Sequence, residues 1–522
     1  MNVAEAVGRT LAELGVAQAF GVVGSGNFEV TNALRAYGVP FVAARHEGGA
    51  ATMADAYARM SDRVTAVTLH QGCGLTNAMT GITEAAKSRT PMIVLAADVP
   101  TGATASNFRI DQNAVVNAVG AVSRRVTSAE TVVEETFAAV ETAVHDRRTV
   151  VLNLPLDVQA QPAELTAVAP LTPPVMPAPH GVEDLIEVLQ TADRPVFIAG
   201  RGARGAGPAV AELAGKVGAL LATSAVAHGL FHGSPWNLGI SGGFATPLAA
   251  SLIADADVVV AWGCSLTKWT TRQGRLLADK VIVQVDLDPQ SPDAKHRIHG
   301  DVGEVARLVA DVAPSRTGYR TEELRAWLAG PQWAYDDLST SNTIDPRTLT
   351  IRLDELLPRD RIVAVDSGNF MGYPAAHLSV PDQYGFCFTQ AFQSIGLGLA
   401  TGLGAALARP DRLPVAAVGD GGFLMSIAEL ETVARLELPM VIVVYNDNAY
   451  GAEVHHFGDA DMGAVSFPDT DIAAIARGYG CHGLTVRTVE DLNDLVLDGR
   501  PVVIDAKITG DGGSWWLQDA FS

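Results

Sequence analysis

The sequence is poor in cysteine, in long apolar runs and in positive charge, and each shortage excludes a class of protein. Its 522 residues include only four cysteines. None of them forms a CxxC pair, so we predict neither a zinc site nor a disulfide framework, and this usage is typical of a reducing cytoplasm. No apolar stretch reaches the length of a membrane span, and the N-terminus has an amphipathic pattern rather than that of a secretory signal. We therefore expect a cytoplasmic protein with no membrane partner.

Positive charge is scarce relative to negative charge. The chain has 37 lysines and arginines against 58 acidic residues, a formal net charge of −21. An excess of this sign argues against nucleic acid and anionic membranes as partners. What the chain has in quantity is apolar residues (48%) and glycine (51 residues), in a length that allows several cores. These features indicate a large soluble enzyme.

Alternating strand and helix patterns divide the chain into three blocks. Short apolar runs separated by helical periodicities predict parallel sheets wrapped by helices. A proline-rich link over 162–179 follows the first block, and a polar stretch ending near Ser341 precedes the third. The predicted fold class is α/β, with three doubly wound parallel-sheet domains over 1–160, 180–315 and 341–522. Strands are expected at 19–23, 41–44, 65–69, 92–96 and 149–154, near 195, 257 and 282, and at 415–418 and 440–445.

The most informative stretch is 414–452, which has the pattern of a strand, a glycine-rich turn, a helix and a second strand. The turn reads Gly419-Asp420-Gly421-Gly422, and its glycines allow a ligand to approach the backbone closely. Ser426 is the predicted N-cap of a helix over 427–436. Free N–H groups at such a turn bind phosphate oxygens. Asp420 and a second oxygen donor after the next strand would hold a hard divalent cation against a diphosphate.

This stretch resembles the diphosphate-binding motif of thiamine diphosphate enzymes, in which an Asn pair follows the GDG turn. Here the pair is Asn446-Asp447, so an aspartate stands where the family has asparagine, which adds a negative charge but keeps an oxygen ligand. The resemblance implies that Asp420, Asp447 and the carbonyl of Ala449 bind Mg²⁺. A Rossmann-like turn with incidental glycines is the alternative interpretation. Further implied cofactor contacts are Gly368, Asn369, Gly419, Gly421, Gly422 and Tyr450.

A second motif of the same family lies at 45–59, RHEGGAATMADAYAR. The resemblance implies that Glu47 bonds N1′ of the aminopyrimidine and favours the tautomer that removes the C2 proton. The alternative for Glu47 is a first-turn acid that complements a helix dipole. Counting back from Asp420, Ile395 falls where the family places an apolar side chain under the cofactor, although such a residue is ordinarily core.

The segment 68–99 is similar to that of benzoylformate decarboxylase. This similarity implies active-site roles for His70, as a proton donor or shuttle, and for Ser25. The alternative for His70 is a polar residue at a strand end. A second histidine of that enzyme has no counterpart, because the aligned residues are Lys268, Trp269 and Thr270.

The segment 108–116, FRIDQNAVV, is similar to a glutamine-bearing loop of acetolactate synthases and benzaldehyde lyase. It implies that Gln112 donates a hydrogen bond at the reactive face of the cofactor; the alternatives are an N-cap and a surface amide. In the region that lines the substrate pocket of these enzymes, Glu453, His455 and His456 are candidates for substrate contact. We further predict that the terminal residues Trp515, Trp516 and Phe521 dock on the body of the protein or cover the pocket.

The expected function is that of a thiamine diphosphate- and Mg²⁺-dependent enzyme that cleaves or forms a C–C bond next to a carbonyl. Decarboxylation of a 2-oxo acid through a C2 ylid and an enamine is the expected reaction. A carboligase, a 2-hydroxyketone lyase acting on a hydroxyketone or aldehyde, and a non-catalytic regulatory homologue stay open. FAD is not favoured, because its usual sequence elements are not evident. An NAD site is also disfavoured, because the glycine-rich turn near residue 24 lacks the third glycine.

The family plan has a consequence for assembly. The Glu47 domain and the Asp420 domain of one chain are not expected to meet, so the cofactor would lie between two chains. A homodimer or homotetramer is therefore expected, with active sites at the interface.

Overall fold

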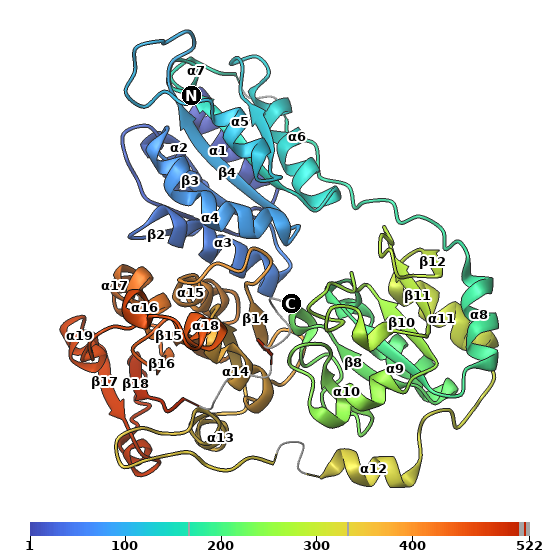
Figure 1. The fold of residues 1–522 in the computed structure, drawn as a ribbon. Helices are drawn as coiled ribbons and strands as arrows, with labels where there is room; N and C mark the ends of the chain where they lie inside the picture. The colour runs from blue at the N-terminus through green and yellow to red at the C-terminus, as the bar shows by residue number, and fades with distance from the viewer. Residues whose placement is uncertain (165–166, 331–333, 511–515, 518–522) are drawn as a thin grey trace.

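The computed structural model describes residues 1–164, 167–330, 334–510 and 516–517. It contains three six-stranded sheets, each covered by helices on both faces, and every pairing between neighbouring strands is parallel (Figure 1). The prediction of three doubly wound parallel sheets is therefore confirmed. No helix in the described part of the chain combines the length and the apolar character that a membrane crossing requires.

The first sheet has the order β2-β1-β3-β4-β6-β5. Its strands β3 and β4 are buried at every position, as expected for central strands covered on both faces. The strand β5 did not stand out in the sequence because only one of its four residues is apolar. The elements are α1 (Val3–Glu13), β1 (Gln18–Gly21), α2 (Phe28–Ala36), β2 (Phe41–Ala43), α3 (Glu47–Ser61), β3 (Thr65–Leu69), α4 (Cys73–Lys87), β4 (Met92–Asp98), α5 (Gln112–Ala118), β5 (Val122–Arg125), α6 (Val132–His145), β6 (Thr149–Pro155) and α7 (Leu156–Gln159).

The middle sheet has a different order, β12-β11-β10-β7-β8-β9. This is the order of a Rossmann sheet, in which strands are added on one side of the first strand, β7, and then on the other. The elements are α8 (Val182–Thr191), β7 (Pro195–Ala199), η1 (Arg201–Ala206), α9 (Gly207–Val217), β8 (Leu220–Thr223), η2 (Ala225–Ala227), β9 (Asn237–Ile240), α10 (Pro247–Ala254), β10 (Val258–Trp262), η3 (Arg275–Leu277), β11 (Val281–Asp286), β12 (His296–His299), α11 (Val302–Val312) and α12 (Glu322–Ala329).

The third sheet, β14-β13-β15-β16-β18-β17, repeats the strand order of the first. Its elements are α13 (Pro346–Leu356), β13 (Arg361–Val365), η4 (Asn369–Met371), α14 (Gly372–His377), β14 (Phe386–Phe388), α15 (Gly398–Ala408), β15 (Leu413–Gly419), α16 (Asp420–Ser426), η5 (Ile427–Glu429), α17 (Leu430–Arg435), β16 (Val441–Asn446), α18 (Gly451–Phe457), η6 (Met462–Ala464), α19 (Ile472–Gly478), β17 (His482–Val486), η7 (Glu490–Asp494) and β18 (Val502–Lys507).

The helix after the glycine-rich turn starts earlier than the sequence suggested. It begins at Asp420, directly at the end of β15, and a short 3₁₀ turn, η5, separates it from α17. Ser426 therefore stands at the N-cap position of η5, as predicted, but its side chain makes no capping bond and no single helix spans 427–436. Ser426 is the last residue of α16, and its hydroxyl donates back to the carbonyl of Gly422 at 3.1 Å.

The N-terminal and C-terminal domains of one chain pack tightly together, which corrects the expectation that they do not meet. The contact lies between α3 and α15 (Figure 1). Both helices are rich in small residues, so their backbones come close: a Cβ on Gly404 would lie 2.2 Å from the carbonyl oxygen of Met53. Ala50, Met53, Leu399 and Leu403 belong to one buried cluster. The two domains therefore share a hydrophobic core.

Candidate functional site

A cavity of about 160 Å³ lies at the carboxyl ends of β13, β15 and β16. Such an edge of a parallel sheet is where ligands usually bind. Every residue predicted to contact the cofactor diphosphate, the metal or the underside of the cofactor lines this cavity. They are Gly368, Asn369, Ile395, Gly419, Asp420, Gly421, Gly422, Asp447, Ala449 and Tyr450.

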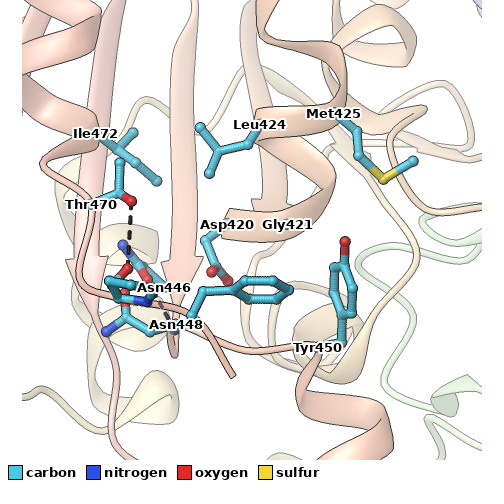
Figure 2. A pocket seen from close by; sticks show the side chains of 11 residues that line it. Asp420, Gly421, Leu424, Met425, Asn446, Asn448, Tyr450, Thr470 and Ile472 are labelled. Atoms are coloured by element: carbon cyan, nitrogen blue, oxygen red, sulfur yellow. Dashed lines mark hydrogen bonds between the residues drawn. The ribbon is translucent and has the colours of Figure 1, made fainter. Parts of the chain in front are cut away.

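A second cavity, of about 260 Å³, adjoins the first and shares Asp420, Gly421 and Tyr450 with it. Figure 2 shows Leu424 and Met425 on one side of this space and Asn448 and Tyr450 on the other. Its apolar rim is open, since Leu424 is 37% and Met425 is 62% exposed. A further apolar surface must cover this rim if the cavity is to exclude water.

The two acidic residues of the motif form a pair in which Asp420 is buried and Asp447 is half-buried. Burial raises the pKa of Asp420 to about 6. Burial and the nearby charge of Asp420 raise the pKa of Asp447 to about 7. Two carboxyl groups held together in this way disfavour joint ionisation unless a cation lies between them. No group of three or more metal-ligating His, Cys, Asp or Glu side chains occurs in the described residues, so the protein offers two carboxylates and leaves the other positions to carbonyl and ligand oxygens. This donor set fits Mg²⁺.

Glycine is required around the cavity because side chains crowd the backbone. A Cβ on Gly421 would lie 2.6 Å from Cε1 of Tyr450, and a Cβ on Gly451 would lie 2.2 Å from Oδ2 of Asp447. A Cβ on Gly422 would lie 2.4 Å from Oδ2 of Asp366. Larger residues would displace the groups that shape the site.

Asp366 is a part of the site that the sequence did not reveal. It is fully buried and accepts backbone N–H bonds from Ser367 (2.8 Å), Gly396 (2.9 Å) and Leu397 (3.2 Å). Burial raises its pKa to about 6 in spite of these bonds. Asp366 thus fixes the turn that carries Ile395 beside the glycine-rich turn. No local signal marks this role, because two of its three partners lie 30 residues or more away.

The turn that carries Asp447 is held by a polar network. The Asn446 amide donates to Asp505 at 2.8 Å and its oxygen accepts from the Asn448 N–H at 3.1 Å. The ammonium group of Lys507 lies 3.1 Å from the Asp505 carboxylate, and its positive charge opposes part of the rise that burial causes in the pKa of Asp420. The network orients the turn that carries Asp447 and offsets part of the negative charge of the acid pair.

Trp516, near the chain end, docks on the same site. Its indole N–H donates to the carbonyl of Asn369 at 3.0 Å, and the side chain is buried. It lies against Gly372, where a Cβ would approach the indole ring to 2.2 Å. The predicted docking is therefore confirmed for Trp516. Trp515 and Phe521 lie outside the described residues.

A second group of predicted residues gathers at the carboxyl edge of the first sheet. Glu47 is the first residue of α3, as expected, and its carboxylate accepts from the Asn77 amide at 3.1 Å. His70 directly follows β3. Both side chains lie close to Gly74: a Cβ there would lie 3.2 Å from Cβ of His70 and 3.6 Å from Oε1 of Glu47. Asn77 was not predicted as a partner of Glu47.

His70 contacts Ser25 across this edge. Its Nδ1 lies 3.2 Å from the carbonyl oxygen of Gln71, and because a carbonyl only accepts, this nitrogen carries the hydrogen. In the neutral ring Nε2 is then an acceptor for the Ser25 hydroxyl, at 3.5 Å. A Cβ on Gly24 would lie 2.5 Å from the imidazole. The glycine-rich turn near residue 24 is therefore shaped around His70.

Gln112 is not placed to contact a ligand in this structure. Its side chain is buried, and its amide nitrogen donates to the carbonyl of Ala97 (3.2 Å) and to Asn153 (2.8 Å). Its oxygen accepts from the N–H of Gly72 at 3.0 Å. The N-cap of α5 is Asp111, so both alternatives, N-cap and surface amide, are also wrong. Gln112 braces the loop that follows His70.

The remaining candidates divide between the cavity and the protein body. Glu453 lines the first cavity, whereas His455 and His456 are not among the residues that line it. Lys268 is exposed. Trp269 packs edge-on against Phe244 at a ring distance of 5.4 Å.

The middle domain has a glycine-rich turn that the sequence analysis passed over. Gly200, Gly202 and Gly205 follow β7 with the spacing of a dinucleotide motif. However, a Cβ on Gly200 would lie 2.3 Å from the carbonyl oxygen of Gly263, and one on Gly202 would lie 2.8 Å from its Cα. Gly200 and Gly202 therefore allow two loops to pack backbone against backbone, whereas Gly205 has open space around it.

Comparison with known proteins matches all three parts of the chain to one family. Residues 1–119 match the N-terminal binding domain of thiamine pyrophosphate (diphosphate) enzymes, 182–309 match their central domain and 366–506 match their C-terminal binding domain. The chain belongs to the thiamine pyrophosphate enzyme family. The family assignment from the two sequence motifs is thus confirmed, and the protein is an enzyme of this kind.

The similar proteins span nearly the whole chain. A probable 2-ketoarginine decarboxylase of Pseudomonas aeruginosa is 30% identical and is matched over 96% of this chain and 91% of its own. A sulfoacetaldehyde acetyltransferase of Alcaligenes xylosoxydans xylosoxydans is 27% identical, over 100% and 95%. The structure of a thiamine diphosphate-dependent 4-hydroxybenzoylformate decarboxylase from Rhodococcus jostii RHA1 matches with a TM-score of 0.82 at 22% identity, covering 98% of this chain and 100% of that one. At that identity the structural match supports the fold alone.

Proposed function

We propose that the protein is a thiamine diphosphate- and Mg²⁺-dependent enzyme that removes the carboxylate of a 2-oxo acid as CO₂. The observation that carries this proposal is the Asp420–Asp447 pair, which faces a glycine-lined cavity in a chain of this family. The name of the 2-ketoarginine decarboxylase relative supports a decarboxylase. The carboligase alternative is less favoured, because the amide of Gln112, which was expected to reach the cofactor as in acetolactate synthases, is fully engaged within its own domain.

The C-terminal domain would hold the cofactor and its metal. Asp420, Asp447 and the carbonyl of Ala449 would bind Mg²⁺, and the glycine-lined turns would bind the diphosphate. Ile395, in the same cavity, would support the thiazolium ring. When bound, thiamine diphosphate supplies the electron sink that C–C cleavage next to a carbonyl requires.

The N-terminal domain would supply the proton chemistry. Glu47, held by Asn77, would bond the aminopyrimidine nitrogen and exchange a proton there. His70 would deliver a proton to the product carbon or take one from a hydroxyl, since an imidazolium donates a proton and a neutral imidazole accepts one. Ser25 would orient the imidazole by donating to its Nε2.

We further propose that the active site forms between two copies of the chain. Neither cavity is lined by a residue of the N-terminal domain: every lining residue falls within 367–472. The side chains of Met425 and Phe467 stand open around the second cavity, and those of Val23 and Phe108 stand open near Ser25 and His70. Placing these two surfaces against each other in a homodimer would cover both and bring Glu47 of one copy to Asp420 of the other. A non-catalytic homologue would have no use for Glu47.

The test is a product analysis of the purified protein with thiamine diphosphate and Mg²⁺. Pyruvate, benzoylformate and 2-ketoarginine would each be supplied with and without an aldehyde acceptor, alongside Glu47→Gln. Release of CO₂ and an aldehyde without an acceptor is expected. A product that forms only with an acceptor would instead indicate a carboligase, and failure to bind the cofactor would overturn the proposal.

A further inference from the structure

The turn that carries Glu47 is held from outside its own domain. Oε1 of Glu429 accepts the backbone N–H groups of Arg45 and His46, both at 3.0 Å. These two residues directly precede Glu47, and His46 is the N-cap of α3. Glu429 belongs to η5 in the C-terminal domain, so the contact crosses the boundary between the two domains.

Glu429 is itself fixed in place. Its side chain is 1% exposed, and its second oxygen accepts from the Thr432 hydroxyl at 2.7 Å. The next residue, Leu430, is buried in the core cluster that also contains Ala50. Both carboxylate oxygens therefore have partners, and the carboxylate cannot move without breaking one of these contacts.

The backbone on each side is adapted to this contact. A Cβ on Gly49 would lie 2.5 Å from Oε1 and 3.0 Å from Cδ of Glu429, so only glycine leaves room for the carboxylate. On the other side, η5 interrupts the helical path between α16 and α17. Such 3₁₀ segments within helices often mark functional positions.

We propose that Glu429 is a positioning residue that orients the Glu47 turn for proton exchange with the cofactor. The proposal rests on the proposed function of Glu47. The segment that begins with Asp420, at the metal, ends with Glu429, at the Glu47 turn, so a single stretch of chain joins both half-sites of one copy. In the homodimer proposed above these half-sites serve two different cofactors, and Glu429 therefore links the two active sites.

The hydrogen-bonding role can be separated from charge by substitution. Glutamine keeps a carbonyl oxygen that can accept both N–H bonds, whereas leucine has a similar size and no acceptor. We expect Glu429→Gln to behave like the parent protein and Glu429→Leu to be impaired. Glu431→Leu is the matched control, because Glu431 contacts the same Arg45 from the surface of the same segment, through the side chain only.

Two measurements test the proposal. In the cofactor-free protein, amide hydrogen exchange of 44–48 should be faster in Glu429→Leu than in the parent, Glu429→Gln and Glu431→Leu. In the Mg²⁺–thiamine diphosphate holoenzyme, exchange of the cofactor C2 proton should slow about 10- to 100-fold in Glu429→Leu, with cofactor affinity and melting temperature close to those of Glu431→Leu.

The outcomes distinguish this proposal from the function on which it rests. Normal C2 exchange in Glu429→Leu, together with slow exchange in Glu47→Gln, would overturn the positioning role alone. Normal exchange in Glu47→Gln would overturn the role of Glu47 and this proposal with it. A Glu429→Leu variant whose cofactor affinity and melting temperature fall well below those of Glu431→Leu, together with slower C2 exchange, would also overturn the proposal, because these losses would show a general structural role.

Discussion

The first and third sheets have the same strand order, but the sites at their carboxyl edges differ in kind. In the third sheet the edge carries a cavity, an acid pair and several glycines. In the first sheet it carries Glu47, His70 and Ser25, in contact with one another or with neutral partners. The shared topology decides where loops gather, and the residues in the loops decide what they do. In the proposed function, one edge would hold a charged ligand and the other would move protons on it.

Glu47→Gln is the strongest test of this difference. Removing the exchangeable acid should lower kcat/KM by about 10²- to 10⁴-fold, while cofactor and Mg²⁺ binding stay close to normal because the cavity is untouched. Steady-state kinetics and cofactor titration measure the two effects separately. Glu134→Gln changes an exposed first-turn acid of another helix in the same domain; it serves as the control for a helix-dipole role and should change neither quantity. A parallel loss of affinity in Glu47→Gln would contradict the division of labour.

Trp516→Ala tests how strongly the site at the carboxyl edge of the third sheet depends on Trp516 near the chain end. Deleting this buried side chain should lower the free energy of unfolding by about 3–5 kcal/mol and weaken cofactor binding through the loosened Asn369 turn. Denaturant unfolding and cofactor titration check these effects. The exposed Trp327 provides a matched control, and an unchanged stability of Trp516→Ala would show that the docking contributes little.

The acid pair predicts an unusual pH dependence of the cofactor-free protein. Because the folded pKa values of Asp420 and Asp447, about 6 and about 7, lie above the ordinary value, the folded state binds more protons than the unfolded state. Stability should therefore fall as the pH rises from about 4 to 8, by on the order of a few kcal/mol. Mg²⁺ with thiamine diphosphate should reverse the loss.

Asp447→Asn sharpens the same point. It restores the family residue and removes one charge, so the pH dependence of the melting temperature should flatten while kcat at saturating cofactor changes little. Melting curves from pH 5 to 8, with and without Mg²⁺, would decide this. A pH dependence as steep as that of the parent would assign it to another group, such as Asp366.

Ser25→Ala should have the smallest effect. The hydrogen bond from Ser25 to His70 is long and neutral, and such a bond contributes about 0.5–1.5 kcal/mol, so kcat should fall less than about tenfold with cofactor affinity unchanged. Comparison with His70→Ala, which removes the imidazole itself, would show whether Ser25 acts through His70. A larger loss in Ser25→Ala than in His70→Ala would contradict that order.

Sequence reasoning predicted the elements whose signals are local. The glycine-rich turn, the acid pair and Glu47 lie in short motifs, and the central strands can be recognised by their apolar composition. It missed Asp366, Asn77 and Glu429, because each acts on residues 30 or more positions away. It also misplaced Gln112, since a loop motif shows a residue type but not whether nearby carbonyls already bind it. The helix start at Asp420 was missed because Ser426 is an equally acceptable cap by type.

The contact between α3 and α15 also affects how the protein is made. The last residue of α3 is Ser61 and the first of α15 is Gly398, so the ribosome adds 337 residues (398 − 61) between them. At common elongation rates this interval is roughly 20–70 s. During that time the Ala50 and Met53 face of the finished N-terminal domain has no partner. We expect a fragment of residues 1–180 to bind hydrophobic dyes that the full chain does not. The newborn chain would then depend on chaperones until its last third is synthesised.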